Sequence, residues 1–323
     1  MKRDNFIEIP LKDQLVKKIQ SYIKTIWHSK VDQNKLESWL NNFNNNDSEI
    51  EEKEKLNMLF LLSKFSYLGE KEIRILLKSL YRDLYKVPII QNIRKKCNDT
   101  LILDIINKEF SKEFKLTKFV AVGGVSESGS MLMMPFRQEN SIPEGKIVGQ
   151  ESIFETVRNN GLIEKNIKYK SISKYIFIDD FIGSGLQGKT KLKDDVKLLK
   201  QKRNDLEINY YVLVATENGL KVLRELKLFN SVEAVFVLDN TFKIFDENSR
   251  YYKISYPKIE STFSKETSIK YGQSLVTKNN ALGFGDCQLL LGFSHNTPNN
   301  TLPIFWGEKN NWKHIFKRFA KIK

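Results

Sequence analysis

Two adjacent carboxylates, Asp179 and Asp180, stand between a run of apolar residues and a short turn of small residues. The apolar run, 175–178, is typical of a buried strand, and the residues after the turn have helical spacing. Small residues in such a turn let backbone N–H groups face an anion, and a helix start adds its positive dipole end. With two carboxylates beside it to accept from hydroxyl groups, this segment predicts a sugar-phosphate site. The anion would be held by Gly183, Ser184, Gly185 and Gln187. The alternative is an incidental strand, turn and helix with acidic caps.

A second glycine-rich turn follows an earlier apolar run, 119–122. Its backbone amides could hold a second anion, and serines beside it are further donors. The turn itself holds no basic residue, so we expect the nearest cations, Arg137 and Lys146, to reach the anion from a mobile loop. The alternative is a plain tight turn. The candidate ligands in and after this turn are Gly123, Gly124, Ser126 and Arg137.

The segment 281–306 gathers amides, hydroxyls and a histidine between apolar runs. His295 and Asn296 could bond the edge of a planar ligand, with an aromatic ring of the same segment as a stacking surface. The candidate rings are Phe293, Phe305 and Trp306. The sequence equally allows a loop whose Asn and Thr side chains bond their own backbone.

The elements that must position these residues fall into three regions. Residues 1–115 predict helices over 11–24, 47–65, 70–85 and 98–114, with the dipeptide at 87–88 ending the third. Residues 116–250 alternate strands (119–122, 175–178, 208–215, 232–238) with helical runs (189–203, 218–229). This pattern predicts an α/β fold with a mainly parallel sheet. Residues 251–323 are mixed, and we expect them to complete the core and to contribute to acceptor recognition.

Composition excludes several classes of protein. Of 323 residues, 41% are hydrophobic and 28% charged, which argues against disorder. No apolar stretch approaches the ~20 residues of a membrane helix, and no export signal is expected at the N-terminus. Two distant cysteines and three scattered histidines predict neither a disulfide framework nor a zinc site and suggest a cytoplasmic protein.

The chain is basic, with 53 Lys and Arg against 39 Asp and Glu, a formal net charge of +14. The segments 189–203 and 313–323 are rich in lysine and are expected to form basic helices. Such faces attract polyanions without reading their sequence, although many lysine-rich faces are merely solvated. Binding of nucleic acid therefore stays one possibility.

Residues 175–187 resemble the PRPP-binding signature of type I phosphoribosyltransferases: an apolar strand, two acids, two apolar residues, a small hydroxylated turn and glycine. By this resemblance, Asp179 and Asp180 contact the ribose 2′- and 3′-hydroxyls, and 183–185 cradle the 5′-phosphate. The resemblance further implies Mg²⁺ at the two aspartates and a pyrophosphate site at the 123–124 turn. Leu186 and Gln187 depart from the pattern, where a small residue and a Thr or Ser are usual.

The chain as a whole resembles a group of phosphoribosyltransferase-like proteins that bacterial conflict and antiphage cassettes encode, including retron-type systems. The resemblance implies a type I phosphoribosyltransferase core and a defence effector with protein partners, rather than a salvage enzyme. Two alternatives stay open. One is a non-catalytic sensor of PRPP or a nucleotide, and the other is a basic subunit that binds nucleic acid within a defence complex.

Overall fold

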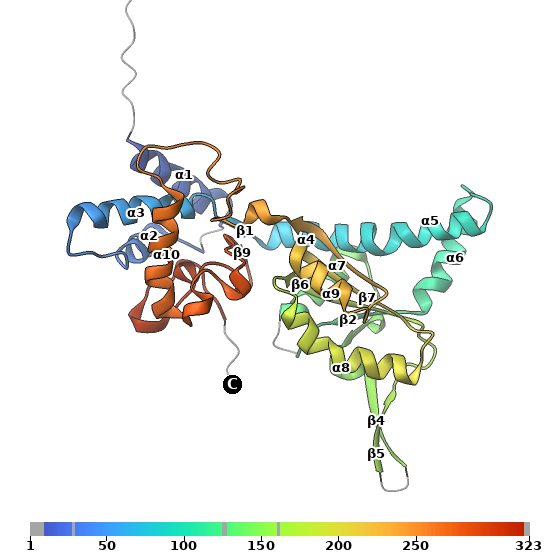
Figure 1. Ribbon diagram of the computed structural model, residues 1–323. Helices are drawn as coiled ribbons and strands as arrows, with labels where there is room; N and C mark the ends of the chain where they lie inside the picture. Colours follow the sequence, from blue (N-terminus) through green and yellow to red (C-terminus); the bar gives the residue numbers. More distant parts are fainter. Residues whose placement is uncertain (1–9, 28–29, 125–127, 160–161, 320–323) are drawn as a thin grey trace, which may run out of the picture. The chain divides into compact units, whose positions relative to one another are not determined.

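The chain folds into two compact units (Figure 1). The sheet unit comprises residues 71–239, and the terminal unit comprises residues 1–70 together with 240–323. The computed structural model describes residues 10–27, 30–124, 128–159 and 162–319. These units divide the chain differently from the three regions expected from the sequence, because residues 1–115 contribute to both of them.

A five-stranded parallel sheet forms the centre of the sheet unit. Its order is β3-β2-β6-β7-β8, and every neighbouring pair is parallel. The strands are β2 (Thr117–Ala121), β3 (Ile147–Gly149), β6 (Lys174–Ile182), β7 (Glu207–Thr216) and β8 (Ser231–Leu238). The α/β fold and the four strands expected from apolar runs are thereby confirmed.

Helices cover the sheet on both faces. Val120 packs with residues of α8 (Leu186–Lys202) and α9 (Glu217–Glu225) in one apolar core. Phe119, its neighbour in β2, faces the other side, where its ring lies 5.0 Å from that of Tyr85 and 5.2 Å from that of Phe136. Adjacent strand residues point to opposite faces, so α8 and α7 (Ser128–Asn140) lie on opposite sides of the sheet.

The helix expected to end at 87–88 instead continues. Helix α4 (Glu70–Ser79) passes through a π-helical segment, η1 (Leu80–Lys86), into α5 (Val87–Lys96). The N–H of Val87 donates to the carbonyl of Arg82, five residues back, so the turn is widened rather than broken. Pro88 lies in the first turn of α5, where a helix tolerates a missing N–H. Helix α6 (Leu103–Lys115) then leads into β2.

Between β3 and β6, the chain forms an antiparallel hairpin that the sequence did not predict. Strands β4 (Phe154–Asn159) and β5 (Leu162–Ile167) pair with each other and with no other strand among the described residues. In Figure 1 the hairpin projects from the sheet unit below α8.

The terminal unit packs the N-terminal helices against the C-terminal segment. Its helices are α1 (Leu11–Thr25), α2 (Gln33–Leu40), α3 (Ser48–Leu62) and α10 (Ser261–Leu275), and β1 (Ser66–Leu68) pairs in parallel with β9 (Leu291–Phe293). The side chain of Asp47 accepts the N–H groups of Glu49 and Ile50 and so caps α3.

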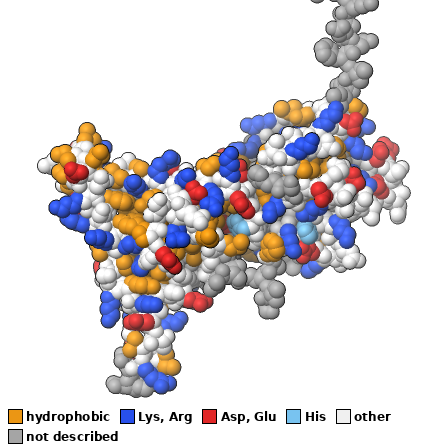
Figure 2. All heavy atoms as spheres, turned by 180° about the vertical axis from the view of Figure 1, so that it is seen from behind, with side chains coloured by type: hydrophobic (Ala, Val, Ile, Leu, Met, Phe, Trp, Pro, Cys, Tyr) orange, Lys and Arg blue, Asp and Glu red, His pale blue; other side chains and the backbone are white. Residues whose placement is uncertain are grey.

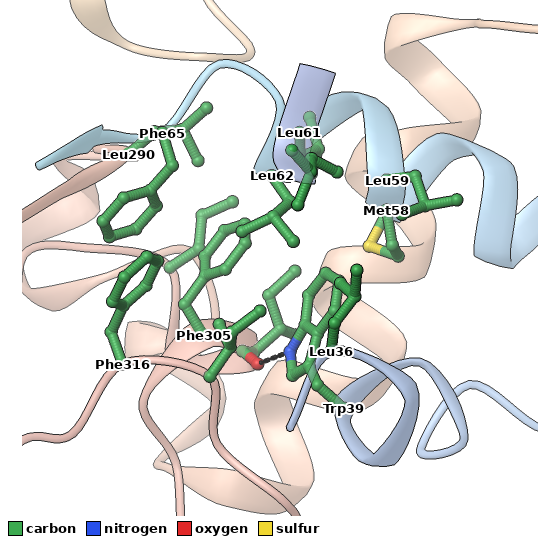
Figure 3. Close-up of a cluster of buried hydrophobic side chains, with 14 of the residues drawn as sticks. Leu36, Trp39, Met58, Leu59, Leu61, Leu62, Phe65, Leu290, Phe305 and Phe316 are labelled. Atoms are coloured by element: carbon green, nitrogen blue, oxygen red, sulfur yellow. Dashed lines mark hydrogen bonds between the residues drawn. The ribbon is translucent and has the colours of Figure 1, made fainter. Parts of the chain in front are cut away.

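Aliphatic and aromatic side chains together fill the core of this unit (Figure 3). The indole of Trp39 stacks on Phe305 with 5.5 Å between ring centroids, and its N–H donates to the carbonyl of Ile304 at 2.7 Å. Phe65 stacks on Phe316 at 4.1 Å. The C-terminal segment 240–323 is thus held to the first 70 residues by a shared core.

The fold also bears on the C-terminal segment and on membrane-spanning helices. The expected basic helix over 313–323 is wrong where the structure describes it, because 313–319 hold no helix. In the described part of the chain, no helix is both long enough and apolar enough to cross a membrane.

Candidate functional site

The strand order of the sheet unit creates a reversal between β2 and β6. Numbered along the chain, the five strands run 2-1-3-4-5 across the sheet, and the helices that follow β2 and β6 lie on opposite faces. In open parallel sheets, ligands bind at the carboxyl ends of the strands beside such a reversal. The two turns singled out in the sequence follow these two strands.

Backbone contacts bring the two turns together. The N–H of Val122 donates to the carbonyl of Ile178 at 3.1 Å, directly before the acidic pair. A Cβ on Gly129, at the start of α7, would lie 2.4 Å from the carbonyl oxygen of Val122 and 3.2 Å from that of Ile178. Only a glycine lets the helix start so close to both strands. The glycine turn at 123–124 therefore lies beside the acidic pair.

The acidic pair lies within β6 and not after it, because the strand continues to Ile182. Asp179 is buried, with 5% of its surface exposed. Its Oδ2 accepts the hydroxyl of Tyr210 at 3.2 Å, and its Oδ1 accepts the N–H of Asp180 at 3.0 Å. Asp180 is only half-buried.

Burial raises the pKa of the Asp179 carboxyl well above its usual range. The charge of Asp180 and a hydrogen bond between the two carboxyl groups raise this pKa further, while the charge of Lys191 opposes the shift. Burial and the neighbouring Asp179 also raise the pKa of Tyr210. A buried carboxyl beside a second one favours a bound proton or a cation at the pair.

The two carboxylates fit a Mg²⁺ ion that takes most of its ligands from elsewhere. Mg²⁺ prefers oxygen donors and is usually held by one or two carboxylates together with substrate phosphates. No cluster of three or more His, Cys, Asp or Glu that could hold a metal occurs among the described residues. Asp179 and Asp180 would therefore hold Mg²⁺ only together with oxygens of a ligand.

The turn after the acidic pair is fixed by the start of the next helix. Gly185 has φ +77°, and a Cβ there would lie 2.9 Å from the carbonyl oxygen of Gly219, so this position requires glycine. The hydroxyl of Thr216 donates to the carbonyl of Gly183 at 2.6 Å and accepts the N–H of Gly219 at 3.0 Å. Ser184 lies between the two glycines of the turn.

Helix α8 starts directly at this turn. Gln187 lies in its first turn, where backbone N–H groups lack acceptors within the helix. The helix is 17 residues long and its N-terminus lies at the turn, so the positive end of its dipole lies there too. Amides and dipole together make this end of α8 suited to an anion.

The glycine turn at 123–124 is tied to α8 by a residue that the sequence did not single out. Gly123 has φ +89°, and its N–H donates to Oε1 of Gln150 at 2.9 Å. The Nε2 of Gln150 donates to the carbonyl of Lys191 at 2.9 Å and to Oδ2 of Asp195 at 2.7 Å. No local motif marks Gln150, because its partners lie 27 to 45 residues away.

Other parts of this turn are less constrained. A Cβ on Gly124 would meet nothing within 4 Å, so this glycine borders open space. Its carbonyl accepts the hydroxyl of Ser130 at 2.8 Å. Ser126 lies outside the described residues.

The prediction that a mobile loop carries Arg137 and Lys146 is wrong. Arg137 lies in the last turn of α7, about 12 Å along the helix from Gly129 at 1.5 Å per residue. Lys146 ends a 3₁₀ turn, donates to the carbonyl of Lys115 at 2.7 Å and lies 5.2 Å from the ring centroid of Phe114. Neither cation thus lies in a loop, since Arg137 belongs to α7 and Lys146 to a 3₁₀ turn, while binding of an anion by Arg137 stays a prediction.

His295 and Asn296 belong to the terminal unit. Oδ1 of Asn296 accepts the N–H groups of Thr297 and Phe319, both at 2.9 Å, and the ring of His295 packs against Phe293 at 5.5 Å. Phe305 is fully buried against Trp39, so it offers no stacking surface. These contacts favour the loop that bonds its own backbone.

Comparison with solved structures finds phosphoribosyltransferases among similar folds. One is the orotate phosphoribosyltransferase of Aeropyrum pernix, with 12% identity over 41% of this chain and 73% of that chain (TM-score 0.24). Another is the xanthine-guanine-hypoxanthine phosphoribosyltransferase of Helicobacter pylori, with 10% identity over 54% of this chain and 88% of that chain (TM-score 0.26). The AQ2163 protein of Aquifex aeolicus shares 14% identity over 65% of this chain and 86% of that chain (TM-score 0.28). TM-scores this low carry no argument about this chain.

Comparison of the sequence with family models covers more of the chain than the comparison with solved structures. No curated protein matches the sequence significantly. The model of the family described as PRTase-CE, however, matches residues 36–318, which is most of both units. The resemblance to phosphoribosyltransferases is thereby confirmed, while the antiphage context stays a prediction. The chain is a phosphoribosyltransferase-like protein that belongs to the PRTase-CE family.

Proposed function

We propose that the sheet unit binds PRPP, or a closely related ribose phosphate, together with Mg²⁺ at the carboxyl ends of β2 and β6. The observation that supports this most is the hydrogen bond from Val122 to Ile178, which sets the glycine turn beside the acidic pair. Two anion-binding turns and two carboxylates then share one edge of the sheet. PRPP carries a phosphate on C5 and a pyrophosphate on C1, at opposite ends of a sugar with two free hydroxyls, and this arrangement matches it.

Each part of the site takes one part of the ligand in this proposal. The first amides of α8 and the turn 183–185 bind the 5′-phosphate, and Asp179 and Asp180 accept from the ribose hydroxyls. The open side of Gly124 faces the pyrophosphate. Bound Mg²⁺ would neutralise pyrophosphate charge beside the two aspartates.

In the transfer reaction, the C1–O bond of PRPP would break with its electron pair leaving on pyrophosphate, and an acceptor would form the new bond to C1. The ring would carry positive charge as this bond loosens, and the carboxylates of the acidic pair would stabilise that charge. The rest of the contribution from this chain is orientation of the sugar by the two fixed turns.

Calorimetric titration with PRPP and Mg²⁺ tests the binding proposal. We expect saturable binding by the wild-type chain and its loss in the double variant Asp179→Asn with Asp180→Asn. The matched control is Asp194→Asn, which removes an exposed carboxylate from α8. Circular dichroism of each variant reports whether it folds. Equal affinity in the double variant and the control would remove the assigned site.

A non-catalytic sensor is the second candidate, favoured by the lack of a basic residue in the sequence 123–130, because positive charge beside a departing pyrophosphate would assist its release. Release of pyrophosphate from PRPP with purine, pyrimidine and amine acceptors distinguishes the two candidates. Turnover that the double aspartate variant abolishes supports the enzyme, and binding without turnover supports the sensor.

We further propose that the protein acts as the effector of a bacterial antiphage system of retron type, with protein partners. The support for this role is the resemblance of the chain as a whole to proteins of conflict cassettes. Plating of phage on cells that carry the gene with its chromosomal neighbours tests it. Protection that the double aspartate variant loses would support the role, and equal plating with and without the intact gene would refute it.

Binding of nucleic acid has less support in the structure. On the face shown in Figure 2, Lys and Arg side chains lie scattered among acidic, apolar and neutral ones and form no single stripe. A nucleic-acid subunit would show affinity for a duplex that falls steeply as salt is added.

A further inference from the structure

The terminal unit contains a cavity of about 480 Å³, within the range of small-molecule sites. It lies between the end of α10, at Leu275, and the segment that follows Trp306. All the residues that line it belong to residues 240–323, so the cavity lies within one compact unit. It is separate from the acidic pair of the sheet unit.

The cavity is built from fixed parts. The indole N–H of Trp306 donates to the carbonyl of Thr301 at 2.9 Å, which sets the orientation of the ring. A Cβ on Gly307 would lie 2.9 Å from Cδ1 of Leu275 and 3.1 Å from the carbonyl oxygen of Pro303. A side chain at position 307 would therefore crowd Leu275, and glycine lets the chain pass close to the end of α10 at the cavity.

The lining combines three kinds of group. The rings of Trp306 and Phe284 offer apolar surface to a planar ligand. The side chains of Asn280 and Asn299 contribute amide groups, and each amide can both donate and accept a hydrogen bond. The third kind of group is cationic.

Lys309 and Arg318 supply positive charge to the lining. The guanidinium of Arg318 lies 5.3 Å from the ring centroid of Trp306 and donates to the carbonyl of Thr297 at 2.7 Å, so this charge is held beside the ring. An oxygen of Glu308, the one acidic residue of the lining, lies 3.3 Å from Nδ1 of His314.

We propose that this cavity binds a mononucleotide. The base would lie against Trp306 with its edge toward the asparagine amides, and the phosphate would lie toward Arg318 and Lys309. An aromatic wall, amides and two cations match the base and the phosphate of one small ligand. This second site goes beyond the proposed PRPP site, and it gives the terminal unit a ligand of its own.

Titration of the full chain with AMP, GMP, CMP and UMP tests the proposal. We expect at least one of them to bind, and Lys309→Met to weaken that binding about three- to tenfold through loss of one contact to the phosphate. Lys313→Met, which removes an exposed lysine outside the lining, is the matched control and should leave affinity unchanged. Because Lys309 is exposed, its substitution should not affect folding.

Trp306→Leu should weaken binding about tenfold or more, since stacking of one base on an aromatic ring contributes about 1–3 kcal/mol. Inorganic phosphate and the free nucleoside should each bind more weakly than the nucleotide. The double variant Asp179→Asn with Asp180→Asn should still bind it, which separates this site from the proposed PRPP site. Absence of binding by all four nucleotides at millimolar concentration, equal binding by Lys309→Met and wild type, or loss of binding in the double aspartate variant would each overturn the proposal.

Discussion

Replacing Thr216 by valine should loosen the turn that we assign to the 5′-phosphate. Its hydroxyl donates to the carbonyl of Gly183 at 2.6 Å and accepts the N–H of Gly219 at 3.0 Å, the capping bond of α9. Loss of a capping side chain costs about 0.5–2 kcal/mol, and loss of a typical hydrogen bond costs about 0.5–1.5 kcal/mol. Valine has nearly the same shape as threonine, so we expect the free energy of unfolding to fall by about 1–3 kcal/mol.

Urea unfolding followed by far-ultraviolet circular dichroism measures this change. All four tryptophans, Trp27, Trp39, Trp306 and Trp312, belong to the terminal unit, so their fluorescence reports that unit and not the site of the substitution. Thr216→Ser keeps the hydroxyl and is the matched control. We expect the serine variant to unfold near wild type and the valine variant to bind PRPP more weakly. If both variants unfold at the same urea concentration, the hydroxyl of Thr216 does not hold the turn.

Three further substitutions test the site. The raised pKa of Asp179 means that the folded chain holds more protons than the unfolded chain above about pH 4, the usual aspartate pKa. Wild-type stability should therefore fall as pH rises from there toward the raised pKa, so Asp179→Asn should gain stability relative to wild type between pH 4 and pH 8 in thermal melts. If the difference in stability between Asp179→Asn and wild type does not change with pH, the pKa of Asp179 is not raised. Gly185→Ala places an alanine at φ +77° and should cost at least about 1–2 kcal/mol in urea unfolding, and an unchanged midpoint would contradict this. Gln150→Ala should weaken calorimetric binding of PRPP but not of ribose 5-phosphate, because Gln150 bonds Gly123 in the pyrophosphate turn; equal losses would refute this role.

The sheet was predictable because its central strands are apolar on both faces. Strands β6 and β7 are covered by helices on two sides, so their sequences read as continuous apolar runs. The acidic pair could be recognised in the sequence because it interrupts such an apolar run. A buried carboxylate such as Asp179 is costly unless a hydrogen bond, a counter-charge or a bound ligand compensates for it. Helix α7 was not predicted, because Pro135 and several small residues weaken its helical pattern.

Contacts between distant segments could not be predicted from the sequence. Strand β1 pairs with β9 across more than 200 residues, and each is only three residues long. The contact between Gly123 and Gln150 likewise depends on the folded sheet unit and not on local spacing. His295 and Asn296 looked like ligand-binding residues because the side-chain types that bind ligands also cap loops.

Hydrogen–deuterium exchange with and without PRPP and Mg²⁺ would locate the ligand on the chain. We expect slower exchange of the amides at 183–188 and 122–124, with no such change in the double variant Asp179→Asn and Asp180→Asn. Protection confined to the terminal unit, or unchanged exchange at both turns under saturating PRPP, would contradict it.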